Sequence, residues 1–238
     1  MATVLYEKPI RIELAGYNLL VNGDSHPKTA RTLSRMKKVM MSPAEDIDLD
    51  MYYMYRNVYR SSDIRFDITV IPPFAIRKEC AKTFGHYHPG SEDGLAYPEV
   101  YQVLRGSAVF ILQKKNRNGS VDASVVYADE GDVILLPPGY GHVSINRGEN
   151  PLVLSNLVYD RFESLYADYE ESQGGAYYYL KDGELVQNTN YIVQKSEQIT
   201  PKTLDERYGF KCKDLLSEFA EHPKKFEFLK KPKTMFRA

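Results

Sequence analysis

Several residue types and patterns are scarce in this chain, and each scarcity excludes a class of protein. The two cysteines, Cys80 and Cys212, lie far apart and form no Cys-x-x-Cys pair, so free thiols in a reducing cytosol are expected. The net charge of −1 gives no general attraction to nucleic acid or to an anionic membrane. Apolar runs stay well short of the ~18 residues of a membrane span. The N-terminus also lacks the layout of a signal peptide. We therefore expect a cytoplasmic protein with no nucleic-acid or membrane partner.

Tryptophan is absent, whereas tyrosine is common at 19 residues, which favours strands and polar pockets. From about residue 64 the apolar residues recur with the period of two that is typical of a strand. Hairpin turns are predicted at Asn118-Gly119 and Asp182-Gly183. Further strands are predicted over residues 100–104, 107–113, 121–127, 132–136, 152–159 and 176–180. Regularly spaced short strands with few helices predict an all-β barrel or sandwich.

The two ends of the chain differ from this central pattern. Leu33, Met36 and Met40 have helical spacing, and residues 213–221 predict a second short helix. We expect a barrel with an N-terminal arm over residues 1–195. The remaining residues, 196–238, are expected to form a C-terminal extension packed on the barrel or on a partner subunit.

Three of the five histidines lie in two short segments, residues 85–88 and 137–142. On a strand, residues i and i+2 share a face, so His86 and His88 are expected side by side with Tyr87 facing away. Glu99 begins the next strand, and a Pro-Pro-Gly turn delivers His142 from a distant one. Three imidazoles and a carboxylate form a ligand set that leaves coordination positions open, as catalytic sites do. A His-x-His pair alone is more often incidental, so this hypothesis depends on both segments together.

The two segments resemble the two motifs of the cupin family. The second matches G-x5-P-x-G-x2-H-x3-N from Gly131 to Asn146. The first matches at His86, His88, Glu99 and Gly106, with Cys80 where the family often has glycine. Residues 89–98 lengthen the family's spacing before Glu99 and predict an extended loop at the mouth of the metal site. The resemblance implies a single cupin barrel, a double-stranded β-helix or jelly roll, with a few short peripheral helices.

The flanking residues resemble the cupin-type glucose-6-phosphate isomerases, which are known chiefly from archaea and some bacteria. The segments 83–88 and 99–101, the strand 66–70 and the pair Tyr52-x-x-Tyr55 carry this resemblance, which covers most of residues 30–195. It implies a metal-dependent interconversion of glucose 6-phosphate and fructose 6-phosphate in a homodimer. The implied metal ligands are His86, His88, Glu99 and His142, with Glu99, Tyr101 and Tyr159 as catalytic residues. The implied residues for the sugar phosphate are Tyr52, Thr69, Thr83 and Gly85.

Three questions stay open at this point. The sequence does not decide whether hydrogen moves between C1 and C2 by proton transfer through Glu99 or by a metal-assisted hydride shift. The ligand set does not choose among Fe(II), Mn(II), Ni(II) and Zn(II), of which we expect Fe(II). Members of the family carry a histidine shortly after the tyrosine that matches Tyr159, in the sequence His-Asp-Tyr. This chain has Ala167-Asp168-Tyr169 at the aligned position. A metal-dependent cupin dioxygenase or oxidase and a non-catalytic sugar-binding cupin are therefore alternatives. A dioxygenase has no need for the phosphate-binding set Tyr52, Thr69 and Thr83.

Overall fold

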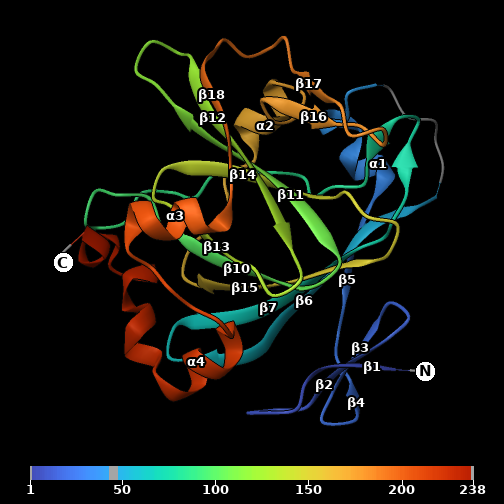
Figure 1. Cartoon of the computed structure of the whole chain (residues 1–238), viewed down its shortest axis with the longest axis vertical. Coiled ribbons are helices and arrows are strands. Elements are labelled where there is room, and N and C mark those ends of the chain that lie inside the picture. The colour runs from blue at the N-terminus through green and yellow to red at the C-terminus, as the bar shows by residue number, and fades with distance from the viewer. Residues whose placement is uncertain (1, 43–47, 237–238) are drawn as a thin grey trace.

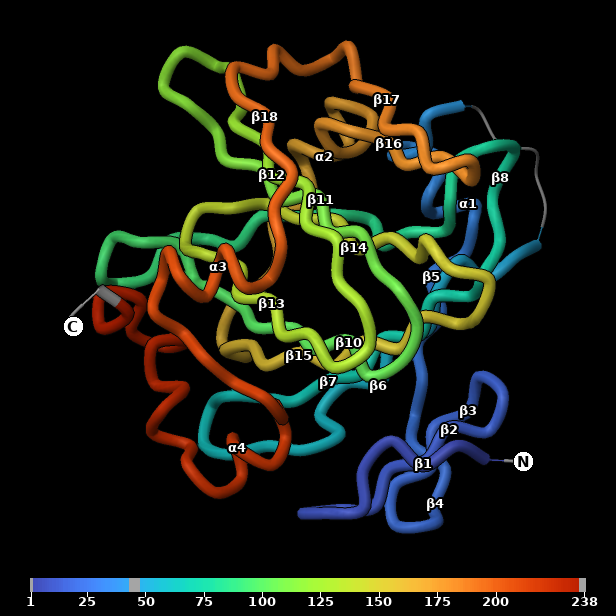
Figure 2. The backbone as a smooth tube through the Cα atoms, in the orientation of Figure 1, coloured from blue at the N-terminus to red at the C-terminus, as the bar shows by residue number. Residues whose placement is uncertain are grey.

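The computed structural model describes residues 2–42 and 48–236, and two facing β-sheets form its body (Figure 1, Figure 2). The first sheet is antiparallel, in the order β13-β10-β15-β7-β6-β5. Its strands are β5 (Thr29–Thr32), β6 (Asp50–Ser61), β7 (Ile64–Ile71), β10 (Glu99–Arg105), β13 (Val133–Leu136) and β15 (Leu152–Tyr159). The second sheet has the order β14-β11-β12-β18. Its strands are β11 (Ser107–Lys115), β12 (Val121–Asp129), β14 (Tyr140–Asn146) and β18 (Val193–Ile199).

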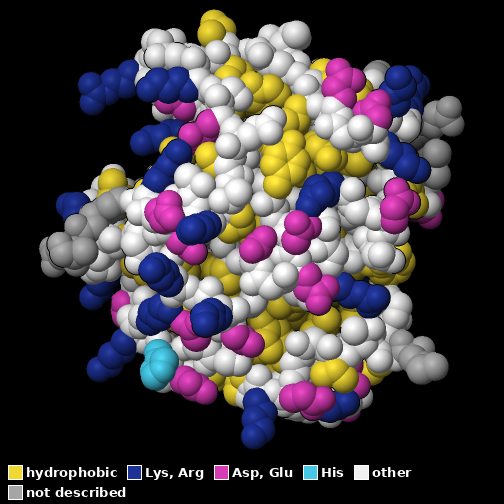
Figure 3. Space-filling model, viewed as in Figure 1, with side chains coloured by type: hydrophobic (Ala, Val, Ile, Leu, Met, Phe, Trp, Pro, Cys, Tyr) yellow, Lys and Arg dark blue, Asp and Glu magenta, His cyan; other side chains and the backbone are white. Residues whose placement is uncertain are grey.

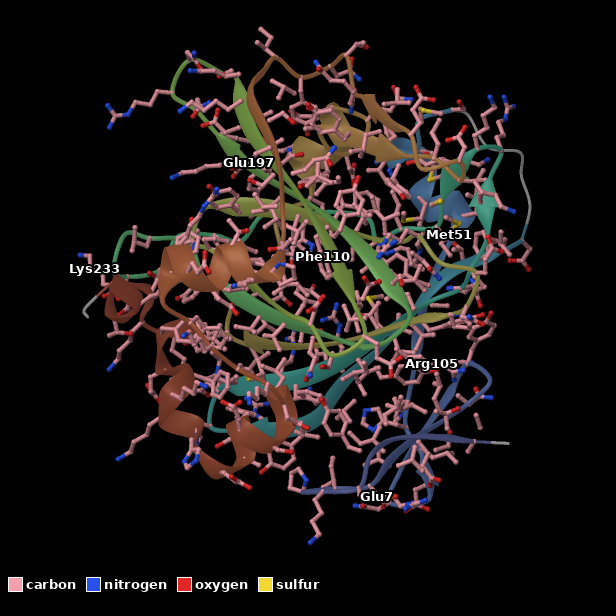
Figure 4. The ribbon with its side chains drawn as sticks, viewed as in Figure 1. Glu7, Met51, Arg105, Phe110, Glu197 and Lys233 are labelled. Carbon is pink, nitrogen blue, oxygen red and sulfur yellow. The ribbon has the colours of Figure 1, made fainter. Side chains whose placement is uncertain are left out.

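The chain crosses between the two sheets repeatedly, which is the connectivity of a jelly roll. It passes from β10 to β11 and β12, returns to the first sheet at β13, crosses to β14 and returns at β15. The core between the sheets contains Val103, Phe110 and Leu154, all fully buried. Phe110 lies on β11 at the middle of the barrel (Figure 4), with its ring edge-to-face with Tyr101 at a centroid distance of 5.5 Å. The predicted all-β single barrel is confirmed.

Shorter elements surround the barrel. Four strands form a separate sheet at the N-terminus: β1 (Thr3–Tyr6), β2 (Ile12–Ala15), β3 (Asn18–Val21) and β4 (Asp24–Ser25). The expected helix near residue 36 is α1 (Leu33–Met36), continued by the 3-10 turn η1 (Lys37–Val39). The other peripheral elements are β8 (Ala75–Ile76), β9 (Glu79–Cys80), α2 (Ala167–Glu171), β16 (Tyr177–Tyr179) and β17 (Leu185–Gln187). Among the described residues, none of the helices has the length and apolar character that crossing a membrane requires.

The C-terminal residues are mostly helical and cover the outer face of the six-stranded sheet. The elements are α3 (Pro201–Tyr208), α4 (Leu215–Glu221), η2 (Pro223–Leu229) and η3 (Pro232–Phe236). Phe219 and Phe226 are fully buried in one cluster with Phe66 of β7 and Val100 of β10. Side chains of the N-terminal sheet, including Ile12, belong to the same cluster. Both ends of the chain therefore shield apolar side chains that the barrel turns outward.

Gln102 ties these ends to strand β10. Its Oε1 accepts from the amide of Leu215 at 2.9 Å and from the hydroxyl of Tyr6 at 3.2 Å. Its Nε2 donates to the carbonyl of Lys213 at 2.9 Å. Because side chains alternate along a strand, the neighbouring Tyr101 points the opposite way, into the barrel.

Strand β7 also has two different faces, with its apolar side chains directed outward and its polar side chains directed into the barrel. Its apolar residues, including Phe66 and Ile68, pack outward against the chain ends. Its polar residues Arg65, Asp67 and Thr69 point inward and line a cavity in the barrel. The polar face of β7 therefore lines the cavity, and the N- and C-terminal segments pack against its apolar face.

Candidate metal and substrate site

The two histidine segments are joined by direct backbone pairing. The amide of His86 donates to the carbonyl of His142 at 3.3 Å, and the amide of His142 donates back to His86 at 3.1 Å. His86 and Tyr87 form isolated bridges here, not a full strand. The hydroxyl of Tyr87 accepts from Nε2 of Gln113 on the far side at 3.0 Å. The expected placement of His86 and His88 on one side is therefore found.

Four ligand atoms converge at this point. One ligand atom each of His86, His88, Glu99 and His142 lies within 4.8 Å of all the others. The Nε2 atoms of His86 and His88 are 3.1 Å apart. Oε2 of Glu99 lies 3.3 Å from Nε2 of His88 and 3.5 Å from Nε2 of His142. That oxygen is buried and has no hydrogen-bond partner among the described residues, as expected for an atom that would coordinate a cation.

Two neighbouring groups fix how the ligands are oriented. Nδ1 of His88 lies 2.9 Å from the carbonyl oxygen of Tyr97, which can only accept, so Nδ1 carries the proton and Nε2 presents its lone pair. Nδ2 of Asn156 donates to Oε1 of Glu99 at 2.7 Å, which leaves Oε2 to face the histidines. Tyr97 belongs to the inserted segment 89–98, and its ring stacks on Phe162 at the cavity with a centroid distance of 4.9 Å. The insertion thus lies at the mouth of the site, as expected.

The charge states of the cluster suit a divalent metal. Burial lowers the pKa of His142 to about 4, and burial together with the other two imidazoles lowers the pKa of His86. Burial alone would raise the pKa of Glu99, but the neighbouring His88 and His142 bring the pKa below its usual value. Neutral imidazoles and an ionised carboxylate are the forms that bind a metal. The residues present therefore fit a borderline divalent ion.

The cavity beside the four ligands contains most of the expected substrate residues. Tyr52, Thr69, Thr83, Gly85 and Tyr101 all line it. Oγ1 of Thr83 accepts from the amide of Ser144 at 3.0 Å, so its own hydroxyl hydrogen remains available to a ligand. The hydroxyl of Tyr52 accepts from the amide of Phe84 at 3.4 Å.

Tyr159 is placed differently from this set. It is not among the described residues that line the cavity, and its ring packs on Tyr97 with a centroid distance of 5.0 Å. The residues of β15 that reach the cavity are Asn156 and Val158, which alternate with Tyr159. Tyr159 therefore lies beside Tyr97 at the mouth of the site.

The residues that follow Tyr159 divide between the cavity and its surroundings. Ser164 and Tyr166 are the residues of this segment that line the cavity. Asp168 instead pairs with Lys115, and the fully buried Tyr169 lies behind Gly85. No histidine of the described residues in this segment lines the cavity, so the role that the resemblance gives to a histidine here has no imidazole.

Sequence reasoning also missed several charged groups. Arg56, Arg65 and Asp67 line the cavity, and Arg65 and Asp67 share the face of Thr69 in the alternation of β7, a signal that was present. The guanidinium of Arg31 lies over the rings of Phe84 and Tyr166, at 5.3 and 5.7 Å from their centroids. Its Nε is buried without a hydrogen-bond partner among the described residues. Arg31 therefore adds positive charge next to the hydroxyl of Tyr52.

Comparison with known proteins identifies the family. The model of the family described as "Glucose-6-phosphate isomerase (GPI)" matches residues 33–195. The chain belongs to the glucose-6-phosphate isomerase family. Curated relatives of that name include those of Thermococcus litoralis, 25% identical over 161 residues that cover 64% of this chain and 79% of the relative, and of Pyrococcus abyssi, 25% identical over 157 residues that cover 63% and 78%. The chain is thus an isomerase, as its motifs implied.

Among solved structures, the chain is similar to an oxalate decarboxylase of Lactobacillus farciminis, with a TM-score of 0.37 and 18% sequence identity. The match covers 51% of this chain and 32% of the decarboxylase. It is also similar to the capsular polysaccharide assembling protein CapF of Staphylococcus aureus, with a TM-score of 0.37 and 16% identity over 50% of this chain and 30% of CapF.

Proposed function

We propose that this protein interconverts glucose 6-phosphate and fructose 6-phosphate, with one divalent metal held by His86, His88, Glu99 and His142. The observation that carries the proposal is the position of four convergent ligand atoms beside a cavity lined by hydroxyl donors for a phosphate. Membership of the isomerase family supports the substrate. A dioxygenase would need the ligands but not the phosphate donors.

The donors at one end of the cavity suit the phosphate. The hydroxyls of Thr69, Thr83 and Tyr52 and the amide of Gly85 are neutral donors, and Arg31 supplies a charge beside them. Gly85 has a φ of 86°, and a Cβ there would lie 2.5 Å from the ring of Tyr169. Glycine at this position therefore lets the backbone and its amide line the cavity, where a larger residue would clash.

The other groups act on the reacting carbons, C1 and C2. A divalent ion held by His86, His88, Glu99 and His142 would supply Lewis acidity that polarises the substrate carbonyl. We assign the proton transfer to Glu99, whose Oε1 accepts from Asn156 and whose Oε2 faces the imidazoles; tight coordination of a metal would weaken it as a base. Burial and the nearby Glu99 raise the pKa of Tyr101 well above its usual value, so its hydroxyl keeps its proton and donates to a substrate oxygen. We assign Tyr159 to orienting the substrate from the mouth of the site.

The remaining features of the proposal concern the metal and the assembly. We propose Fe(II) as the ion, with Mn(II), Ni(II) or Zn(II) as substitutes. We also propose a cytoplasmic homodimer that acts in glycolysis and gluconeogenesis. Light scattering should then give about twice the chain mass of 27.3 kDa, and a mass equal to one chain would contradict the dimer.

The deciding experiment measures turnover and metal content together. Protein stripped by a chelator is reloaded with Fe(II), Mn(II), Ni(II) or Zn(II) and assayed with glucose 6-phosphate in a coupled assay. His142→Ala should lose both metal and activity, whereas the matched control His222→Ala, at an exposed position, should keep both. Absence of turnover with every ion refutes the isomerase, and full metal retention by His142→Ala refutes the ligand assignment.

A further inference from the structure

Arg65 lies at the end of the cavity wall that is remote from the phosphate donors. Arg65, Asp67 and Thr69 follow one another on the inward face of β7, and all three line the cavity. Arg65 precedes Thr69 by four positions, so their Cα atoms are about 13 Å apart at the usual rise of a strand. Since Thr69 belongs to the phosphate end, Arg65 marks the other end of this wall.

The register of the sheet sets Arg65 level with Glu99. Arg65 pairs with Val158 of β15, whose neighbour Leu157 pairs with Val100 of β10. Continued by one residue, this register puts Glu99 opposite Val158 and in the same row as Arg65. Two strand spacings separate the ends of such a row, which is about 10 Å between Cα atoms. Both end side chains line the cavity, so a small ligand bound over Val158 lies between them.

Asp67 holds the Arg65 side chain in this place. Its Oδ2 accepts from Nε of Arg65 at 2.7 Å, and its Oδ1 accepts from the amide of Asn57 at 2.8 Å. The Asp67 side chain is 6% exposed and the Arg65 side chain 20% exposed. Because Asp67 takes only Nε, the remaining N–H donors of the Arg65 guanidinium have no acceptor among the described residues. A fixed, recessed donor group with unused N–H bonds is suited to a ligand in the cavity.

A β-bulge brings a second positive charge to this wall. The pairing of β6 with β7 shifts between Tyr55 and Tyr59, and Asn57 has a φ of 56°. Bulges beside active sites commonly re-aim a side chain, and this one directs Arg56 to the cavity. A terminal nitrogen of Arg56 lies 3.4 Å from Oδ2 of Asp67, but the Arg56 side chain is 48% exposed. It is therefore the outer of the two arginines.

The charge of this wall exceeds what its carboxylate requires. Asp67 already has the Asn57 amide and Arg56, so its neutralisation does not by itself call for Arg65. On the molecular face drawn in Figure 3, basic and acidic side chains are interspersed. The recessed guanidinium of Arg65 is therefore a feature of the cavity, distinct from the general surface charge.

We infer that Arg65 is a further catalytic residue, whose guanidinium donates to the oxygen on C1 of the substrate as negative charge develops there. The inference rests on the proposed function, which places the phosphate at the Thr69 end and so directs C1 toward Arg65 and Glu99. Preorganised donors aimed at a developing oxyanion are commonly the largest single source of rate enhancement in an enzyme. Asp67 is a positioning residue, because it acts through Arg65.

The electron movements put charge on that oxygen by either route of isomerisation. In proton transfer, Glu99 takes the hydrogen of C2 as a proton, the C2–H electron pair forms the C1=C2 bond, and the carbonyl pair moves onto the oxygen of C1. Glu99 then returns the proton to C1, while the C2 hydroxyl proton passes to the oxygen of C1 and leaves a C2 carbonyl. In a hydride shift, the hydrogen moves from C2 to C1 with its electron pair, and the oxygen of C1 gains the carbonyl pair and the C2 hydroxyl proton. Arg65 acts on the same oxygen in both routes.

The test separates binding from turnover in the metal-loaded protein. Arg65→Gln should reduce kcat about 100-fold, as the loss of one oxyanion donor does, with KM little changed. Thr83→Val should instead raise KM, because it acts at the phosphate end. Arg117→Gln, which removes the same charge from an exposed hairpin turn, should leave both constants unchanged.

Chemical rescue distinguishes catalysis from a structural role. Arg65→Ala leaves a space that a free guanidinium ion fits, so added guanidinium chloride, far below denaturing concentrations, should restore part of kcat in a saturable way. Sodium chloride at equal ionic strength should not, and Thr83→Val should not respond to either salt. Should Arg65→Ala fail to fold in urea denaturation, Arg65→Lys keeps the charge and must retain more of kcat than Arg65→Gln.

The outcomes separate this inference from the proposed function. If the unaltered protein turns over the sugar phosphate and Arg65→Gln matches it, the isomerase stands and Arg65 is not catalytic. A raised KM at unchanged kcat in Arg65→Gln also overturns the inference, because Arg65 would then bind the ground state alone. Loss of metal from Arg65→Gln in elemental analysis overturns it as well, since Arg65 would then act on the ligands. Absence of turnover by the unaltered protein with every ion refutes both.

Discussion

Four glycines near the metal site provide a graded test of how closely the backbone approaches its neighbours there. Substitution by alanine adds one methyl group, and the structure says what that group meets at each position. At Gly90 there is nothing within 4 Å and φ is not positive, and at Gly139 there is open space but φ is 84°. At Gly141 the methyl group would lie 2.7 Å from the ring of Tyr87. At Gly85 it would lie 2.5 Å from the ring of Tyr169, with φ at 86°.

These differences translate into an expected order of stability. Gly90→Ala should be neutral or slightly stabilising, because alanine restricts the unfolded chain. Gly139→Ala should cost about 1–2 kcal/mol through left-handed backbone strain alone. Gly141→Ala should cost about 1–3 kcal/mol through overpacking alone. Gly85→Ala combines both effects and should cost about 2–5 kcal/mol.

Urea denaturation of the metal-free variants measures the free energy of unfolding, and elemental analysis after reloading measures the site. Gly141 precedes His142, and Gly85 precedes His86, so both packing variants should also bind less metal. Gly139→Ala serves as the matched control, because it shares the backbone strain of Gly85→Ala without the clash. If Gly85→Ala is no less stable than Gly139→Ala, the close approach of Tyr169 is wrong.

Further predictions concern pH, metal affinity, the phosphate end and a buried ion pair. The metal-free protein should lose stability as pH falls from about 6.5 to about 4, because His142, with its pKa lowered to about 4, stays neutral in the folded protein and gains a proton on unfolding. His142 alone gives a slope of ~1.4 kcal/mol per pH unit, and His86, whose pKa is also lowered, adds to this slope. A flat urea-denaturation profile over this range would contradict the prediction. Asn156→Leu should weaken metal binding about 10- to 100-fold in a chelator competition, because it frees Oε1 of Glu99, and unchanged affinity would show that the amide is dispensable. Arg31→Met should raise KM for the sugar phosphate about 10-fold and change kcat less, whereas an unchanged KM would remove Arg31 from the phosphate end. Lys82→Met should cost about 3–5 kcal/mol in urea denaturation, because it leaves Glu79, 2.6 Å from Nζ and 2% exposed, as an unpaired buried charge, and a loss below 1 kcal/mol would mean that water reaches the pair.

The sequence predicted the parts of the molecule that local pattern controls. Strand β7 was visible as alternation from Ile64, and the hairpin at Asn118-Gly119 was visible as turn chemistry. The four ligands were recognisable because motif spacing, once the fold is known, fixes which strands meet. The N-terminal sheet was not predicted, since its strands have two to four residues, too few to establish a period.

The charged wall of the cavity shows a different limit of sequence reasoning. The bulge near Asn57 interrupts the alternation of β6, so the inward direction of Arg56 depends on pairing with β7 and not on its own neighbours. Its anchor, Asp67, is on a strand whose polar face would ordinarily be assigned to solvent. The polar face of β7 lines a cavity because the chain ends cover the apolar face on the opposite side of the strand. The pattern of β7 alone does not show this.

The contacts of Gln102 imply that the barrel and the chain ends evolved together. The segment that matches the family, residues 33–195, contains Gln102 but neither Tyr6 nor Leu215, whose polar groups it satisfies. A relative without such ends has no partner for a buried amide at this position and should carry a different residue there. Residue 102 and the presence of the two ends are therefore expected to covary across the family. A fragment limited to residues 33–195 should aggregate through the uncovered side chains of Phe66 and Val100.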